Sequence, residues 1–316
     1  MIRKIAVVGL GGVGGYFGGK IGQLLSHKEI ELYFIARGNH LEAIKKDGLY
    51  LSTEKEGDMV CHPTLATDQI SQLPSLDLIL LCVKSYDLNT VLQLLKDKIE
   101  DHTIILPLLN GVDIYERVRE VIHKAIILPA TVFVGTHIEK AGKVTQKGGA
   151  CKILMCHDPK HIDVTPVDLF NLFSESKIKY EWFHNVTAEI WKKYLFIASF
   201  GLVTAAYNKS VGEVMASNDL SDNTLSIISE IYNLSQKKGV NLPQEIIEMS
   251  FNKGNDFPYE TKTSFQRDFE NMERQDERDL FGGTILRMSQ QLGCESPVTQ
   301  RIYSKLHQMK PDKMEV

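Results

Sequence analysis

Apolar and polar residues follow two different patterns along the chain. From the amino terminus to about residue 181, short apolar runs alternate with segments of helical periodicity, which is typical of βαβ units that build a parallel sheet. The apolar runs contain few polar residues, as expected for strands that helices cover on both faces. The predicted strands are Lys4 to Val8, Glu31 to Ile35, Leu76 to Val83, Thr103 to Pro107 and Ala125 to Val134.

Three shorter runs follow these strands. Thr136 to Ile138 and Lys143 to Gln146 flank a turn at Ala141 and Gly142, which predicts an antiparallel hairpin. Another strand is expected from Lys152 to Cys156. We therefore expect the sheet to be mixed at one edge.

Beyond about Asn185 the apolar residues recur at the period of an amphipathic helix. This change predicts an α/β Rossmann domain over residues 1–184 and an all-α domain over residues 185–316, with a disordered tail from Lys310 to Val316. The predicted helices are Ala188 to Tyr207, Asn223 to Lys238, Pro243 to Asn252, Phe265 to Met272, Glu277 to Leu292 and Pro297 to Met309.

Composition narrows the class of protein. The chain has 316 residues, 43% hydrophobic and 24% charged, which is typical of a globular protein with two domains. A net charge of -4 gives no electrostatic reason to expect a nucleic-acid partner, and no apolar run is long enough to span a membrane. The five cysteines are scattered without metal spacing, so we predict reduced thiols, no metal and a cytoplasmic location.

A glycine-rich turn follows the first predicted strand. Gly9, Gly11 and Gly14 form the pattern G-x-G-x-x-G at the start of a predicted helix. Such a turn presents backbone amides and a helix amino terminus to a pyrophosphate group. Further glycines at 15, 18, 19 and 22 predict that this helix packs unusually closely. The residues expected to contact a dinucleotide here are Gly9, Leu10, Gly11, Gly12, Val13 and Gly14.

The end of the second predicted strand indicates which dinucleotide binds. Enzymes that use NAD place Asp or Glu at this point for the ribose hydroxyl, whereas this chain has Arg37, which can pair with a 2′-phosphate. We therefore predict NADP(H) as the cofactor. A solvated surface arginine is the alternative interpretation.

Lys84 and Asn110 each follow a predicted strand, at the carboxyl edge where open α/β sheets bind ligands. An ordinary surface lysine and a turn residue are the alternatives.

Lys193 is the most informative residue of the helical part. It shares a helix face with Ile190, Ile197 and Phe200, so its ammonium is predicted to lie in apolar surroundings. Burial lowers the pKa of a lysine, and such a lysine suits the protonation of a ketone oxygen during reduction. A side chain that reaches solvent is the alternative. The acidic residues from Asp268 to Asp279 could supply a carboxylate partner.

Taken together, these features make the chain resemble the ketopantoate reductase (2-dehydropantoate 2-reductase) family over nearly its whole length. The resemblance rests on the glycine turn, Arg37, Lys84, Asn110-Gly111, Trp191-Lys192-Lys193, Ser264, Asp268 and the segment from Glu277 to Gly283.

The resemblance implies roles for single residues. Lys193 would be the general acid, with Glu277 as its partner near the substrate hydroxyl. Asn110 and Lys84 would lie between nicotinamide and substrate, and Ser264 would bind the carboxylate of a 2-oxo acid. The implied reaction is the NADPH-dependent reduction of 2-dehydropantoate to pantoate, a step towards pantothenate.

Three departures from the family pattern bear on the substrate and the site. Ile197 and Gly201 stand where the family commonly has Asn, so polar contacts with the substrate are missing. The interval between Asp268 and Glu277 is one residue longer than is usual in the family, which makes Asp276 a competitor for the role of Glu277. Since a substrate without a hydroxyl group would suit Ile197 better, another branched 2-oxo acid is an alternative substrate. A catalytically silent NADP-binding sensor is an alternative from another class, and a homodimer is the candidate assembly.

Overall fold

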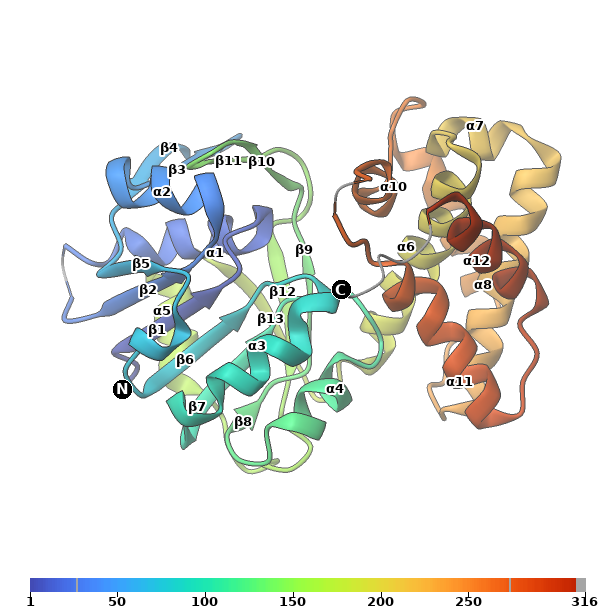
Figure 1. The fold of residues 1–316 in the computed structure, drawn as a ribbon. Helices are drawn as coiled ribbons and strands as arrows, with labels where there is room; N and C mark the ends of the chain where they lie inside the picture. The colour runs from blue at the N-terminus through green and yellow to red at the C-terminus, as the bar shows by residue number, and fades with distance from the viewer. Residues whose placement is uncertain (27, 273, 311–316) are drawn as a thin grey trace. The chain divides into compact units, whose positions relative to one another are not determined.

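The computed structural model describes residues 1–26, 28–272 and 274–310 (Figure 1). The chain divides into two compact units, one formed by Met1–Asn110 with Ile114–Val186 and the other by Gly111–Asp113 with Thr187–Val316. The first unit is built on a parallel sheet and the second is helical. The predicted combination of a Rossmann domain with a helical domain is therefore confirmed.

A six-stranded parallel sheet forms the centre of the first unit (Figure 1). Its strand order is β5-β2-β1-β6-β7-β8, so the order reverses between β1 and β6. Open α/β sheets bind ligands at the carboxyl ends of the strands at such a reversal. The strands are β5 (Leu65–Thr67), β2 (Glu31–Ile35), β1 (Lys4–Val8), β6 (Leu76–Leu81), β7 (Ile99–Pro107) and β8 (Ile126–Ile127).

The predicted mixed edge of this sheet is wrong, because the antiparallel strands form two separate sheets. The predicted hairpin exists, but it pairs with a second hairpin that the sequence did not reveal, since the strands of that hairpin are short and only one residue of β4 is buried. The four-stranded sheet contains β10 (Thr136–Lys140), β11 (Lys143–Gln146), β3 (Leu49–Thr53) and β4 (Gly57–Cys61). The three-stranded sheet contains β13 (Lys179–Phe183), β12 (Lys152–Cys156) and β9 (Ala130–Phe133).

The predicted strand from Ala125 to Val134 is also corrected. It is two strands that belong to different sheets, and Pro129 lies between them. Proline has no amide hydrogen for a strand ladder, so it favours a break at this point.

Helix α1 (Gly12–Gly22) packs between the six-stranded and the four-stranded sheets (Figure 1). A Cβ atom on Gly14 would lie 2.0 Å from the carbonyl oxygen of Gly9, and one on Gly18 would lie 2.9 Å from the ring of Phe34. The opposite side of the helix is equally tight, as Cβ atoms on Gly15, Gly19 and Gly22 would meet Val144, Leu51 and Cys61. The close packing predicted from the extra glycines is confirmed.

The remaining helices of the first unit are α2 (Gly38–Asp47), α3 (Leu88–Leu95), α4 (Ile114–Val121) and α5 (Val167–Glu175). The second unit is organised around α6 (Thr187–Tyr207), which contacts α7, α8, α9, α10 and α12. Their bounds are α7 (Val211–Ala216), α8 (Asn218–Lys237), α9 (Ile246–Asn252), α10 (Ser264–Glu270), α11 (Thr284–Leu292) and α12 (Pro297–Met309).

Two features of the helical unit differ from the prediction. The helix expected from Glu277 begins instead as a π-helical turn, η5 (Asp279–Gly283), before α11. Helix α7 was not predicted, although Ser210 and Glu213 form a capping box at its start. Among the residues that the structure describes, no helix is both long and apolar enough to cross a membrane.

Candidate active site

The glycine turn lies at the carboxyl end of β1, where the strand order reverses. Gly9 has φ of +96°, a conformation that favours glycine, and its amide donates to the carbonyl of Ile35 on β2. Leu10 is buried, and α1 begins at Gly12. The turn therefore joins β1 to the amino terminus of α1 in the arrangement that binds phosphate groups.

Gly11 differs from the other glycines of the turn. A Cβ atom on Gly12 would lie 2.7 Å from Oγ1 of Thr136, whereas one on Gly11 would meet no protein atom within 4 Å. Contacts within the protein therefore do not explain the glycine at 11. The open space beside its backbone fits a pyrophosphate group that needs close approach to the chain.

Arg37 follows β2 and precedes α2, at the same edge of the sheet. Its side chain is 75% exposed, and its guanidinium forms an ion pair with Asp87. Asp87 belongs to a short 3-10 helix, η2 (Ser85–Asp87), that follows β6. This pair could not be predicted from the sequence, since the two residues lie in different βαβ units.

Lys84 and Asn110 follow adjacent strands. Leu81 at the end of β6 pairs with Pro107 at the end of β7, and each candidate residue lies three positions beyond its strand. Both side chains are half-buried. The carboxyl edge of the sheet therefore carries the glycine turn, Arg37, Lys84 and Asn110 on four neighbouring strand ends.

Lys193 lies in the second turn of α6 and is half-buried. Removal from water and, to a smaller extent, the charge of Lys253 lower the pKa of Lys193 from 10.5 to about 7. Lys253 begins the 3-10 helix η4 (Lys253–Asp256), and its Nζ lies 5.6 Å from the centre of the Phe196 ring. A lysine with such a pKa can give up or take up a proton near neutral pH.

Helix α6 supports the other two predicted residues of the helical unit. The hydroxyl of Tyr194, the residue after Lys193, lies 2.8 Å from the carbonyl oxygens of both Leu280 and Phe281 and donates to this pair. These carbonyls lie in η5, three and four residues beyond Glu277, which is itself buried. A π-helical turn of this kind is frequent at functional sites.

Ser264 is exposed at the first position of α10. Thr263, which precedes it, caps the helix by accepting from the amide of Gln266, and its hydroxyl lies 2.9 Å from that of Thr204 on α6. The segment that carries Ser264 is thereby attached to the same helix as Lys193.

The structure distinguishes the two candidate carboxylates, Asp276 and Glu277. Asp276 accepts hydrogen bonds from the backbone and guanidinium of Arg278, and the ammonium of Lys310 lies 3.1 Å from it. All three side chains are buried. Asp276 therefore belongs to a structural ion cluster.

The prediction of a disordered tail from Lys310 is wrong for Lys310 itself, because its side chain is buried in this cluster. The rest of the predicted tail, residues 311–316, lies outside the described residues.

Aromatic and apolar side chains follow Lys193 along α6. Phe196 stacks on Phe257 with ring centres 5.3 Å apart, and Ile197 is half-buried one turn beyond Lys193. A Cβ atom on Gly201 would lie 3.5 Å from Phe265, which is an ordinary van der Waals distance, so packing does not require glycine at this position.

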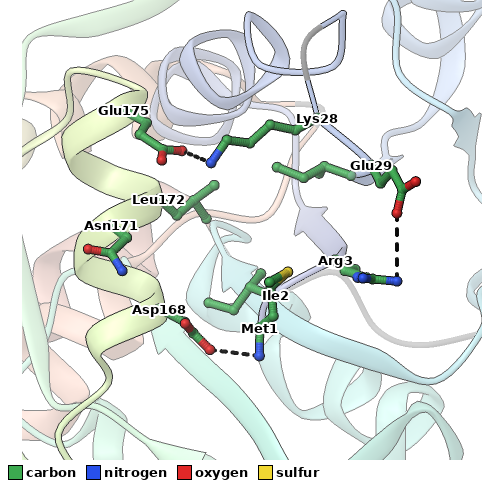
Figure 2. A pocket seen from close by; sticks show the side chains of 10 residues that line it. Met1, Ile2, Arg3, Lys28, Glu29, Asp168, Asn171, Leu172 and Glu175 are labelled. Carbon is green, nitrogen blue, oxygen red and sulfur yellow. Dashed lines mark ion pairs between the residues drawn. The ribbon is translucent and has the colours of Figure 1, made fainter.

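A surface pocket of about 410 Å³ lies elsewhere on the first unit (Figure 2). Its lining includes residues just before β1 and β2, at the amino ends of these strands, together with residues of α5. Figure 2 shows ion pairs across it, which join Lys28 to Glu175, Arg3 to Glu29, and the amino terminus to Asp168. The pocket is therefore remote from the carboxyl edge that the predicted cofactor residues occupy.

The sequence did not reveal Asp87, Tyr194, Lys253 or Thr263 as parts of the site. Tyr194 could have been noticed, since it follows Lys193 directly at the start of the uncharged part of a long helix. Within the described ranges, no cluster of three or more His, Cys, Asp or Glu side chains could hold a metal ion.

Comparison with known families matches both units. Residues 5–155 match the family model described as ketopantoate reductase PanE/ApbA, and residues 185–310 match its C-terminal counterpart.

Known proteins are similar over the whole chain. An uncharacterized oxidoreductase, YkpB of Bacillus subtilis, is 28% identical over 98% of this chain and 100% of that protein. A 2-dehydropantoate 2-reductase of Streptococcus pyogenes is 26% identical over 85% of this chain and 86% of that protein. The crystal structure of a PanE/ApbA family ketopantoate reductase from Ralstonia eutropha superposes with a TM-score of 0.87 at 23% identity, covering 97% of this chain and 98% of the other.

Proposed function

This chain belongs to the ketopantoate reductase PanE/ApbA family of oxidoreductases, and from that premise we propose that it reduces a branched 2-oxo acid with NADPH. Family membership indicates a nicotinamide dinucleotide as the cofactor. The choice of NADPH is supported by Arg37, which offers a guanidinium for a 2′-phosphate at the end of β2. The first substrate to test is 2-dehydropantoate.

The chain's own residues would bind both reactants and move one proton. The turn from Gly9 to Gly14 would hold the pyrophosphate, and when bound, NADPH supplies a hydride to the carbonyl carbon of the substrate. Lys193 would donate its proton to the carbonyl oxygen, with Glu277 as its partner at the substrate hydroxyl. Lys84 and Asn110 would line the space between the reactants, and Ser264 would bind the carboxylate.

The observation that carries this proposal is that the glycine turn, Arg37, Lys84 and Asn110 follow four neighbouring strand ends in a chain whose two units both match the family. The pKa of Lys193 supports the role of this residue as the acid. Its lowered pKa of about 7 means that the side chain is close to half-protonated at neutral pH. A proton donor works best when its pKa lies near the working pH. An ordinary surface lysine, with a pKa above 10, would release its proton to the ketone oxygen far less readily.

A second candidate substrate is supported by the side chains around Lys193. Ile197 and Gly201 offer no side-chain hydrogen bond, and Phe196, which stacks on Phe257, is a further apolar side chain on the same helix. The hydroxyl group of 2-dehydropantoate would lack a hydrogen-bond partner among these side chains, whereas a 2-oxo acid with an apolar side chain has no such group to satisfy. We therefore propose that branched 2-oxo acids without a hydroxyl group are reduced at least as well as 2-dehydropantoate.

Replacement of Lys193 tests the assignment of the acid. Lys193→Ala should keep NADPH binding, followed by nicotinamide fluorescence, and should lower kcat by roughly 10²- to 10⁴-fold. Lys192→Ala is the matched control, because Lys192 pairs with Glu189 on the same helix. Unchanged turnover in Lys193→Ala would refute the proposed role.

The substrate is tested with the wild-type protein. Loss of NADPH absorbance should be measured with a panel of 2-oxo acids, including 2-dehydropantoate and branched acids without a hydroxyl group. NADPH binding without turnover of any acid would instead support the NADP-binding sensor.

The homodimer and the cytoplasmic location stay predictions. Light scattering during gel filtration would measure the assembly.

A further inference from the structure

Two charged side chains meet above the end of β1. Arg37 follows β2, and Asp87 lies in η2 after β6. Strands β2 and β6 flank β1 on its two sides, with Val8 paired to Ile35 on one side and to Leu81 on the other. The ion pair between Arg37 and Asp87 therefore joins the two strand ends that border the glycine turn.

The pair is open to solvent, with 75% of the Arg37 side chain and 24% of the Asp87 side chain exposed. Exposed ion pairs contribute little to stability, so folding alone gives a weak reason for placing a carboxylate here. A ligand at this edge can reach both groups.

The two groups act in opposite directions on the two forms of the cofactor. A 2′-phosphate carries close to two negative charges and would compete with Asp87 for the guanidinium. Its approach also brings it near the carboxylate, which repels it. The ribose of NADH carries a hydroxyl at that position, which can donate a hydrogen bond to a carboxylate and leaves the ion pair intact.

We propose that Asp87 is a specificity-determining residue that limits the preference of this protein for NADPH over NADH. The inference rests on the proposed function, in which a dinucleotide lies on the glycine turn with its adenosine ribose beside Arg37. Arg37 attracts the phosphate, and Asp87 opposes it. The chain therefore accepts both cofactors with a modest difference in affinity.

The experiment is a comparison of dissociation constants. Purified wild type and Asp87→Asn are titrated with NADPH and with NADH, and binding is followed by nicotinamide fluorescence. Asn keeps the size of the side chain and removes its charge. We expect NADPH to bind at least threefold more tightly to the variant and NADH to bind equally or more weakly, so that the ratio of the two constants moves at least threefold towards NADPH.

Two controls isolate the pair. Glu42→Gln removes a carboxylate that pairs with Lys45 on α2, and it should leave the ratio of the two constants unchanged. Arg37→Ala combined with Asp87→Asn tests the coupling. The gain in NADPH affinity on removal of the Asp87 charge should be smaller when Arg37 is absent, because competition for the guanidinium is then lost.

A ratio that moves towards NADPH by less than threefold, or that moves towards NADH, would overturn the inference. The second result would mean that Asp87 orients Arg37 for the phosphate. Failure of the proposed function looks different. Neither dinucleotide would bind to the wild-type protein if the cofactor site were wrong, and a sensor would bind NADPH without reducing any 2-oxo acid, whatever the ratio of the two constants.

Discussion

Lys193 and Lys253 form a pair of like charges whose effect can be measured. Removal from water disfavours the ammonium of Lys193, and the positive charge of Lys253 disfavours it further. Both effects lower the pKa, to about 7. The proposed acid therefore loses its proton within the range where enzymes are normally assayed.

The pH dependence of the reaction should report this pKa. Ketone reduction needs the protonated lysine, so kcat should fall as the pH rises through about 7. Oxidation of the 2-hydroxy acid needs the neutral lysine and should increase over the same range. Rates in both directions, measured from pH 5 to 9 (roughly two units on either side of the pKa), provide the check. The same slope in both directions would contradict the assignment.

Lys253→Gln should move this profile. Removal of the positive charge raises the pKa of Lys193, so the reduction reaction should stay active to higher pH. The pKa of Lys193 should not return to its ordinary value of 10.5 in this variant, because burial is the larger cause of the lowering. Lys262→Gln is a suitable control, since Lys262 pairs with Glu270 at the surface. An unmoved profile would show that Lys253 does not act on Lys193.

Helix α1 and its turn are the elements that decide cofactor binding. Gly14 is required by the protein itself, since a Cβ atom would lie 2.0 Å from the carbonyl oxygen of Gly9. Gly11 has φ of −70° and open space around it, so alanine fits the folded chain. The two glycines therefore have separable roles.

Alanine at each glycine should separate stability from binding. Gly14→Ala should lower the free energy of unfolding by about 1–3 kcal/mol through overpacking. Gly11→Ala should change it by less than about 0.5 kcal/mol and weaken NADPH binding at least roughly tenfold (about 1.4 kcal/mol). Urea denaturation and fluorescence titration measure the two effects. Undiminished NADPH affinity in Gly11→Ala would contradict the placement of the pyrophosphate.

The elements that sequence reasoning predicted well are those whose signals are local. The turn at Gly9 and the helix Pro297–Met309, with proline at its first position, were both readable from neighbouring residues. The strand pair β3–β4 was missed because its pattern of buried residues is short. The site could be predicted only as single residues, since contacts such as Arg37–Asp87 join segments far apart in the chain.

Each of the two units contains a buried ion cluster. Asp158 pairs with Arg119 in the first unit, and Asp276 pairs with Arg278 and Lys310 in the second. Burial by itself would raise the pKa of Asp276, but the hydrogen bonds and the charge of Arg278 outweigh it and hold the pKa below its usual range. The folded state therefore binds fewer protons than the unfolded chain at moderately acidic pH, so this stabilisation is present above the usual carboxyl pKa and is lost as the pH falls through the lowered one.

Asp276→Asn should destabilise the helical unit by about 3 kcal/mol, because Arg278 and Lys310 stay buried with less compensation. Asp279→Asn is the matched control in the same segment, since Asp279 pairs with Arg287 at the surface, and it should cost less than about 1 kcal/mol. Urea denaturation at neutral and at acidic pH measures both. Equal losses in the two variants would contradict a structural role for the buried cluster.

The position of α1 between two sheets also has a consequence for how this fold can diverge. Six of the eleven residues of the helix are glycines, and the positions on both of its sides have no room for a methyl group. Substitutions on this helix should therefore be tolerated mainly at the positions that are not glycine. In a descendant that lost the four-stranded sheet, the glycines that face that sheet would no longer be required by close contacts. Alanine should then accumulate first at positions 15, 19 and 22.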